Sequence, residues 1–180
     1  MNASIDKVLL DAWTITDILK NYFGKELDYK PLFDMVKGYD LTRPNNKVPI
    51  KLYIDMCSWI EQNLGKFNLI KIGRNIGEST YKVMLAQDLA TENSSPLEIM
   101  NALIITAQKG VRDEQKRGWI VLEHSDRRIT MRKTQVFNSS IQLGMLDYLV
   151  RKTKVMGVKV ELIREVAKGF EFDDYCISWL

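Results

Sequence analysis

The sequence has 180 residues, a formal net charge of +3, one histidine and two cysteines. This length suits one domain, or at most two small ones, and can bury a sizeable core without disulfides. Cys57, His124 and Cys176 are one donor short of a four-ligand Cys/His zinc site, and any catalytic system built on a histidine would have to use His124. Much metal and hydrolytic chemistry is therefore excluded.

The mild positive charge is too small to indicate a nucleic-acid partner. The longest apolar run, residues 102–107, is far shorter than the roughly 18 residues that span a membrane. Residues 1–7 show no signal-peptide pattern, and two free thiols favour a reducing compartment, so we expect a cytoplasmic location.

The chain begins with a helical pattern. Apolar residues recur at three- and four-residue spacing over residues 5–23 and predict a helix, with Ser4 as its N-cap and Gly24 at its end. A shorter helix is predicted over residues 28–37. The segment 38–49 has two prolines, two asparagines and no periodicity, which predicts a loop.

Two longer helices follow. An apolar stripe predicts one over residues 50–64, closed by Gly65. The next is predicted over residues 68–88 and carries Gly73 and Gly77 on one face, where another backbone could approach closely.

A fifth helix is predicted over residues 96–111. Ser95 is placed as its N-cap, Pro96 falls in the first turn, and Glu98 lies in the same turn.

The period then changes from helical to extended. The runs 118–124 and 129–133 predict a hairpin, residues 138–154 a sixth helix, and the runs 158–163 and 175–179 a second hairpin. Helices followed by two hairpins that flank a helix predict an α+β fold with one four-stranded antiparallel sheet.

This order of elements resembles the fold shared by heme-nitric-oxide-binding (H-NOX) domains, 4-vinyl-reductase-type domains and small subunits of the TRAPP vesicle-tethering complex. Segment 137–146 looks like the helix start that follows the first hairpin in such domains, and segments 157–162 and 175–179 are similar to their closing hairpin. Segment 39–44 resembles a group of uncharacterised bacterial relatives.

The resemblance implies one H-NOX-like domain over residues 1–180, with a mainly helical part at 1–111 and a sheet-containing part at 112–180. Heme-binding members use a His on a helix as iron ligand and a Tyr-x-Ser-x-Arg motif for the heme carboxylates. Here the one histidine, His124, falls in a predicted strand and the motif is absent. We therefore expect neither heme nor another cofactor or metal.

The interior is rich in methionine, with eight in the chain. Flexible thioether side chains can line a pocket for an apolar ligand, although they also fill gaps in an ordinary core. The candidate pocket residues are Cys57, Met84, Met100, Leu103 and Met145.

The first predicted hairpin is the most basic region. Arg127, Arg128, Arg132 and Lys133 are candidates for an acidic partner or an anion, and a solvated charged face is the alternative.

These observations favour a non-enzymatic sensory or ligand-binding domain that holds a small apolar molecule and signals to a partner protein. The alternative is an interaction module or homodimer in the style of TRAPP subunits, without a ligand. An enzyme using paired carboxylates such as Asp173 and Asp174 is disfavoured, because adjacent residues on a strand face opposite ways.

Overall fold

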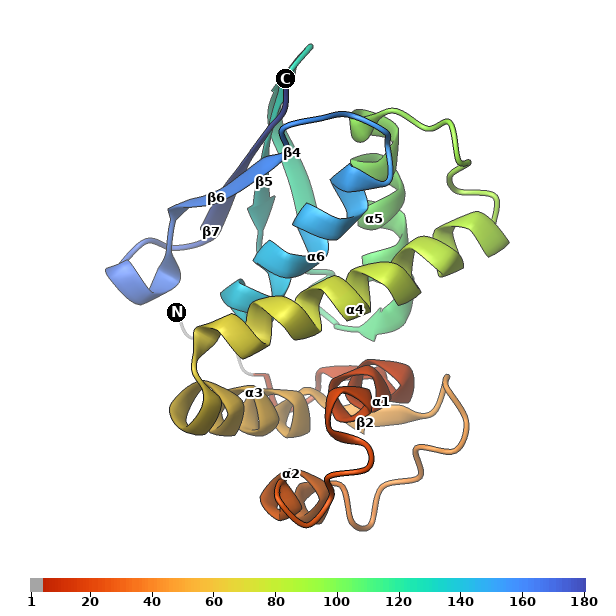
Figure 1. Ribbon diagram of the computed structural model, residues 1–180, viewed down its shortest axis with the longest axis vertical. Helices are drawn as coiled ribbons and strands as arrows, with labels where there is room; N and C mark the ends of the chain where they lie inside the picture. The colour runs from red at the N-terminus through yellow and green to blue at the C-terminus, as the bar shows by residue number, and fades with distance from the viewer. Residues whose placement is uncertain (1–4) are drawn as a thin grey trace.

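The computed structural model describes residues 5–180, and the predicted N-cap Ser4 lies outside them. Two layers are visible in Figure 1. One contains α1 (Ala12–Leu19), α2 (Lys30–Met35) and α3 (Ile50–Leu64). The other contains α4 (Lys66–Ala86), α5 (Pro96–Gly110), α6 (Ser139–Arg151) and a four-stranded sheet.

The predicted sheet is confirmed. Its strands are β4 (Trp119–Ser125), β5 (Arg128–Lys133), β6 (Lys159–Arg164) and β7 (Asp173–Ser178), in the order β4-β5-β7-β6 with every pair antiparallel. Inward-facing residues alternate with outward-facing ones, as in β5, where Ile129 and Met131 are buried. Helices α5 and α6 cover this inner face (Figure 1).

The predicted first helix is partly wrong. Residues Leu9–Asp11 form strand β1, which pairs with β2 (Lys47–Pro49) and with β3 (Val111–Arg112), and the helix begins only at Ala12. Val8, Leu10 and Ala12 are buried at every second position, so this stretch fits a strand period as well as a helical one. Pairing with distant segments decides between the two.

The small sheet β2-β1-β3 joins the two halves of the chain. Strand β3 directly follows α5, so the end of that helix is tied to the N-terminal layer. The predicted division between residues 111 and 112 falls inside β3.

Other elements lie close to their predicted positions. Gly65 ends α3 with φ +82°, and α5 begins with a capping box in which Ser95 and Glu98 bond each other's backbone N–H. The second helix is shorter than predicted and spans only six residues.

Helices α4 and α6 cross at very close range, as the glycine spacing predicts. A Cβ added to Gly73 would lie 2.0 Å from the carbonyl oxygen of Ile141, and one added to Gly144 would lie 2.0 Å from that of Ile70. At Gly77 the nearest atom would be Cβ of Tyr148, at 2.9 Å. Only glycine permits this backbone contact.

Candidate functional site

A cavity of about 70 Å³ lies between the two layers. Both layers contribute to its wall, and the second layer does so through α4, α5, α6, β4 and the loop before α6. The lining residues are Trp13, Thr14, Tyr53, Ile76, Thr80, Leu103, Thr106, Ala107, Gly110, Val111, Trp119, Gln135, Phe137, Ile141, Gln142 and Met145.

Aromatic rings form much of the apolar wall. Tyr53 and Phe137 meet edge to face, with ring centroids 5.1 Å apart, and Trp119 packs on Tyr175 at 5.4 Å. The Tyr53 hydroxyl accepts a hydrogen bond from the backbone N–H of Asn138 at 3.2 Å. The pKa of Tyr53 is raised well above its usual value. Complete burial is the main cause, and the neighbouring Cys57 adds a smaller contribution. The phenol therefore stays neutral.

One polar side chain at the cavity, that of Gln135, lacks a protein partner. Gln135 is 6% exposed, and neither atom of its amide has a hydrogen-bond partner within residues 5–180. Buried amides are normally bonded, because an unmade hydrogen bond costs free energy. Gln135 is thus available to a polar group that enters the cavity.

The predicted pocket residues divide into two groups. Leu103 and Met145 line the cavity. Cys57, Met84 and Met100 do not, although all three are buried in the surrounding core. The stripe on each helix identifies its inward face, but it does not distinguish a solid core from a cavity wall.

Several lining residues were not singled out from the sequence. Trp13 and Tyr53 lie on apolar helical stripes, which indicate burial but not a cavity. Gln135 follows β5 in an irregular segment, and no sequence signal marks it.

The candidate basic residues do not gather into one patch. Arg132 and Lys133 are consecutive on β5 and face opposite sides of the sheet. Arg132 makes a bidentate bond to Asp174 at 2.7 and 2.8 Å, whereas Lys133 is buried and lies 2.8 Å from Asp173. Arg128 lies 3.7 Å from Glu123.

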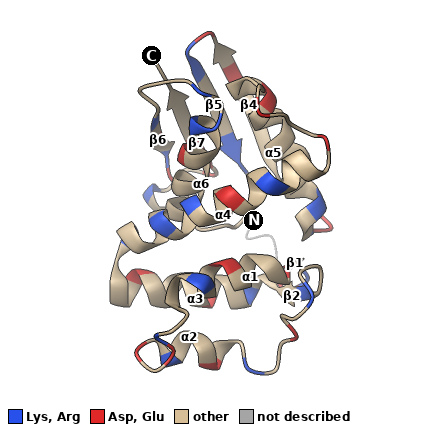
Figure 2. Ribbon diagram, turned by 45° about the vertical axis from the view of Figure 1, so that its right-hand side comes forward, with Lys and Arg blue, Asp and Glu red and all other residues tan. Residues whose placement is uncertain are grey.

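Arg127 is exposed at the turn between β4 and β5. In Figure 2 the basic and acidic segments of the ribbon are interspersed. The four candidate residues thus occupy separate surroundings rather than a common anion site.

The residues at the cavity do not fit heme. The volume is far below the roughly 300–1,000 Å³ of small-molecule sites. His124 is exposed near the outer end of β4 and does not line the cavity, and Cys57 does not line it either. The lining does include Tyr53 and Met145, but the Tyr53 oxygen already accepts a hydrogen bond and stays protonated.

Within residues 5–180, no cluster of three or more His, Cys, Asp or Glu is placed to hold a metal ion. Among the helices of the same range, none has both the length and the apolar character needed to cross a membrane.

Comparison with solved structures identifies the fold. An H-NOX protein from S. oneidensis, described in the Fe(II)NO ligation state, matches with a TM-score of 0.69 and 9% identity over 93% of this chain and 98% of that one. An Fe(II) unliganded H-NOX protein from K. algicida matches with a TM-score of 0.64 and 11% identity over 95% and 97%. The chain therefore has an H-NOX-like α+β fold over nearly its whole length.

This confirms the H-NOX-like fold that the order of elements predicted. Comparison by sequence adds no relative. No protein-family model matches the chain, and no curated protein matches it either. At these identities the likeness shows the fold, and the function has to be argued from the site.

Proposed function

We propose that this chain is a sensory domain that binds a small, mostly apolar molecule without heme and passes the binding event to a partner protein. The observation that carries the proposal is the mostly apolar cavity of about 70 Å³ between two layers of an H-NOX-like fold. An apolar cavity binds small apolar molecules because they regain contacts that an empty space lacks.

The position of the cavity supports a sensory role. Trp13 and Tyr53 come from the N-terminal layer, whereas Ile76, Leu103 and Met145 come from the sheet-containing layer. A molecule that fills the space changes the contacts between the layers, and so shifts the population of their relative positions.

Xenon is a suitable probe, because it is apolar and needs no specific polar contact. In protein labelled at the methionine methyl groups, we expect the NMR signal of Met145 to move as xenon pressure rises. Met84 and Met100 are matched internal controls, since both are fully buried outside the cavity wall and their signals should stay in place.

A pair of variants sharpens this test. Leu103→Ala enlarges the cavity and should increase the xenon response of Met145, at a stability cost of about 2–5 kcal/mol. Leu32→Ala removes an equally buried leucine from α2 and should leave the response unchanged. The proposal is contradicted if the chemical shift of the Met145 methyl group does not change with xenon pressure in either the parent chain or Leu103→Ala.

An interaction module without a ligand is the second candidate. Ile120 and Leu122 project from edge strand β4 and are 47% and 43% exposed, which suits a docking face. Size exclusion with light scattering would then show a dimer, and native mass spectrometry would show no added small mass.

A further inference from the structure

A second concave site lies beside the cavity. It is a groove of about 510 Å³ between α1, the segment 44–47, α4 and α5. Trp13, Thr106 and Gly110 line both the groove and the cavity, so the two spaces are neighbours across a thin wall. The volume falls within the range of small-molecule sites.

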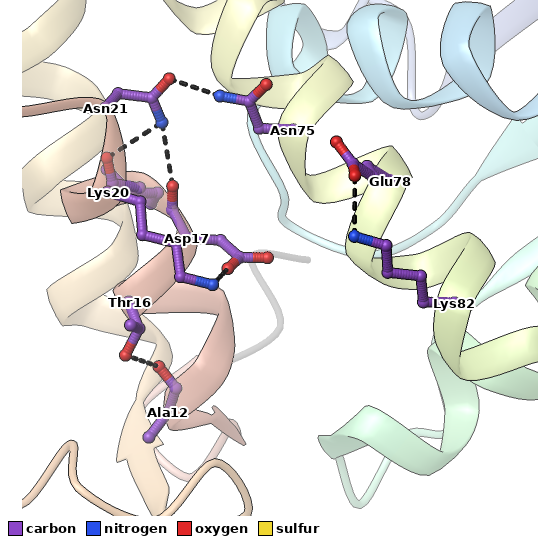
Figure 3. A network of polar contacts seen from close by, with 9 residues as sticks. Ala12, Thr16, Asp17, Lys20, Asn21, Asn75, Glu78 and Lys82 are labelled. Atoms are coloured by element: carbon purple, nitrogen blue, oxygen red, sulfur yellow. Dashed lines mark hydrogen bonds and ion pairs between the residues drawn. The ribbon is translucent and has the colours of Figure 1, made fainter. Parts of the chain in front are cut away.

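The first notable group in the groove is Asp17 of α1. Its side chain is only 3% exposed, and its Oδ1 accepts a hydrogen bond from Lys20 Nζ at 2.5 Å. Its Oδ2 is buried and has no partner within residues 5–180. Figure 3 shows this carboxylate pointing from α1 into the space toward α4. A buried carboxylate oxygen without a donor is costly, so a ligand that supplies one gains that free energy.

A hydrogen-bonded bridge joins the end of α1 to α4 about one turn beyond Asp17. Asn21 Nδ2 donates to the backbone oxygens of Asp17 and Ile18, which turns its Oδ1 toward Asn75 of α4. Asn75 Nδ2 then donates to Asn21 Oδ1 at 2.6 Å (Figure 3). This bridge links the 3-10 turn Lys20–Tyr22, which directly follows α1, to α4 beside the groove.

The second notable group is Lys109 at the end of α5. Three lysines line the groove, and two of them are neutralised by aspartates: Lys20 by Asp17 and Lys47 by Asp11, each at 2.5 Å. Lys109 Nζ donates only to the neutral amide oxygen of Gln87, at 3.0 Å, and has no carboxylate within 4.0 Å among the described residues. The groove therefore holds one uncompensated positive charge.

We propose that this groove binds a small zwitterion of the amino-acid type. Its ammonium group donates to the free Oδ2 of Asp17, and its carboxylate pairs with the ammonium of Lys109. Charge-assisted hydrogen bonds of this kind are stronger than neutral ones. Trp13, Pro44 and Val83 supply the apolar surface against which a side chain of the ligand lies.

The test uses the whole chain and the common L-amino acids as probes, each at millimolar concentration. We expect at least one of them to raise the melting temperature, because a ligand that binds only the folded state stabilises it. The same amino acid should move the indole N–H signal of Trp13 in an NMR titration. Its carboxamide and N-acetyl derivatives, which each lack one charge, should bind about tenfold more weakly or worse.

Variants locate the site. Asp17→Asn replaces the free acceptor by an amide of equal size, and Lys109→Met removes the charge from an exposed side chain that the fold does not need. Each should weaken binding about tenfold or more. Asp34→Asn alters a partly exposed aspartate on α2, away from the groove, and should not change the affinity.

Two results would overturn the proposal. One is that no amino acid raises the melting temperature or moves the Trp13 signal. The other is that both Asp17→Asn and Lys109→Met bind the amino acid as tightly as the parent chain does. Neither result bears on the cavity, because its probe is apolar and its reporter is Met145.

Discussion

At the scale of single residues, the most consequential charge is the buried ammonium of Lys133. It lies 2.8 Å from Asp173 and also donates to the backbone oxygen of Phe137, while Asp173 accepts from Ser139 Oγ at 2.5 Å and from the backbone N–H of Val166 at 2.8 Å. This cluster ties the end of β5 to the start of β7 and to the first turn of α6.

Asp173→Asn should therefore destabilise the fold by about 3–5 kcal/mol, because it leaves Lys133 charged, buried and unpaired. The double variant Lys133→Met, Asp173→Asn should recover a large part of that loss, since neither member of the pair then carries a charge. Urea unfolding of the three proteins measures the difference. Equal losses in the single and double variants would show that the pair is not coupled.

The same aspartate gives a pH dependence with a defined sign. Burial raises the pKa of Asp173, but the charge of Lys133 and the hydrogen bonds from Lys133, Ser139 and Val166 outweigh burial, and the pKa is lowered. A lowered folded-state pKa stabilises the fold above the unfolded-state value near 3.8, and this stabilisation is lost as the pH falls below it. The stability gap between the parent chain and Asp173→Asn should thus narrow on acidification below about pH 4.

Cys57 is predicted to be inert toward thiol reagents. Burial in α3 raises the pKa of the Cys57 thiol to about 12. A hydrogen bond with Tyr53 lowers this pKa, but its effect is smaller than that of burial. Because the thiolate is the reactive form, alkylation of Cys57 by iodoacetamide at pH 8 should be negligible in the folded chain and fast in denaturant. Rapid labelling of the native protein, mapped by peptide mass spectrometry, would contradict this burial.

At the scale of elements, the crossing of α4 and α6 sets the frame of the site. Ile76 and Thr80 of α4 and Ile141, Gln142 and Met145 of α6 all line the cavity. The separation of these two helices therefore controls its width. Three glycines permit the contact, because backbone atoms of the opposite helix, or Cβ of Tyr148, occupy the places where their Cβ atoms would be.

Gly73→Ala should destabilise the chain by about 3 kcal/mol or more, because the new Cβ would meet the carbonyl of Ile141 and force the helices apart. Gly110→Ala is the matched control. It lies at the end of α5, where the nearest atom to an added Cβ is Asp11 Oδ2 at 3.7 Å. Thermal unfolding should show a large loss for the first variant and little change for the second, and similar losses would contradict the close crossing.

At the scale of the whole molecule, local patterns predict the order of elements because each helix or hairpin carries its own signal. The capping box at Ser95 and the turn between β4 and β5 act within a few residues. The small sheet β2-β1-β3 could not be predicted from local patterns. Its strands have only two or three residues, and they form because they pair with segments far along the chain.

The site is harder to predict than the fold for a related reason. Leu103 and Met145 line the cavity while Met84 and Met100 fill the core, yet all four lie on inward helical faces. The difference arises from how the two layers meet, which no local pattern encodes. Asp17 and Lys109 are 92 positions apart by their numbers, and only the fold brings them to one groove.

We propose that the small apolar cavity of this H-NOX-like fold does not hold heme. Heme titration of the purified chain, followed by absorption spectroscopy, tests it most directly. We predict no stable Soret band above that of free heme, because the cavity of about 70 Å³ offers neither the volume nor a free iron ligand. A stoichiometric Soret band that shifts with nitric oxide would contradict this proposal.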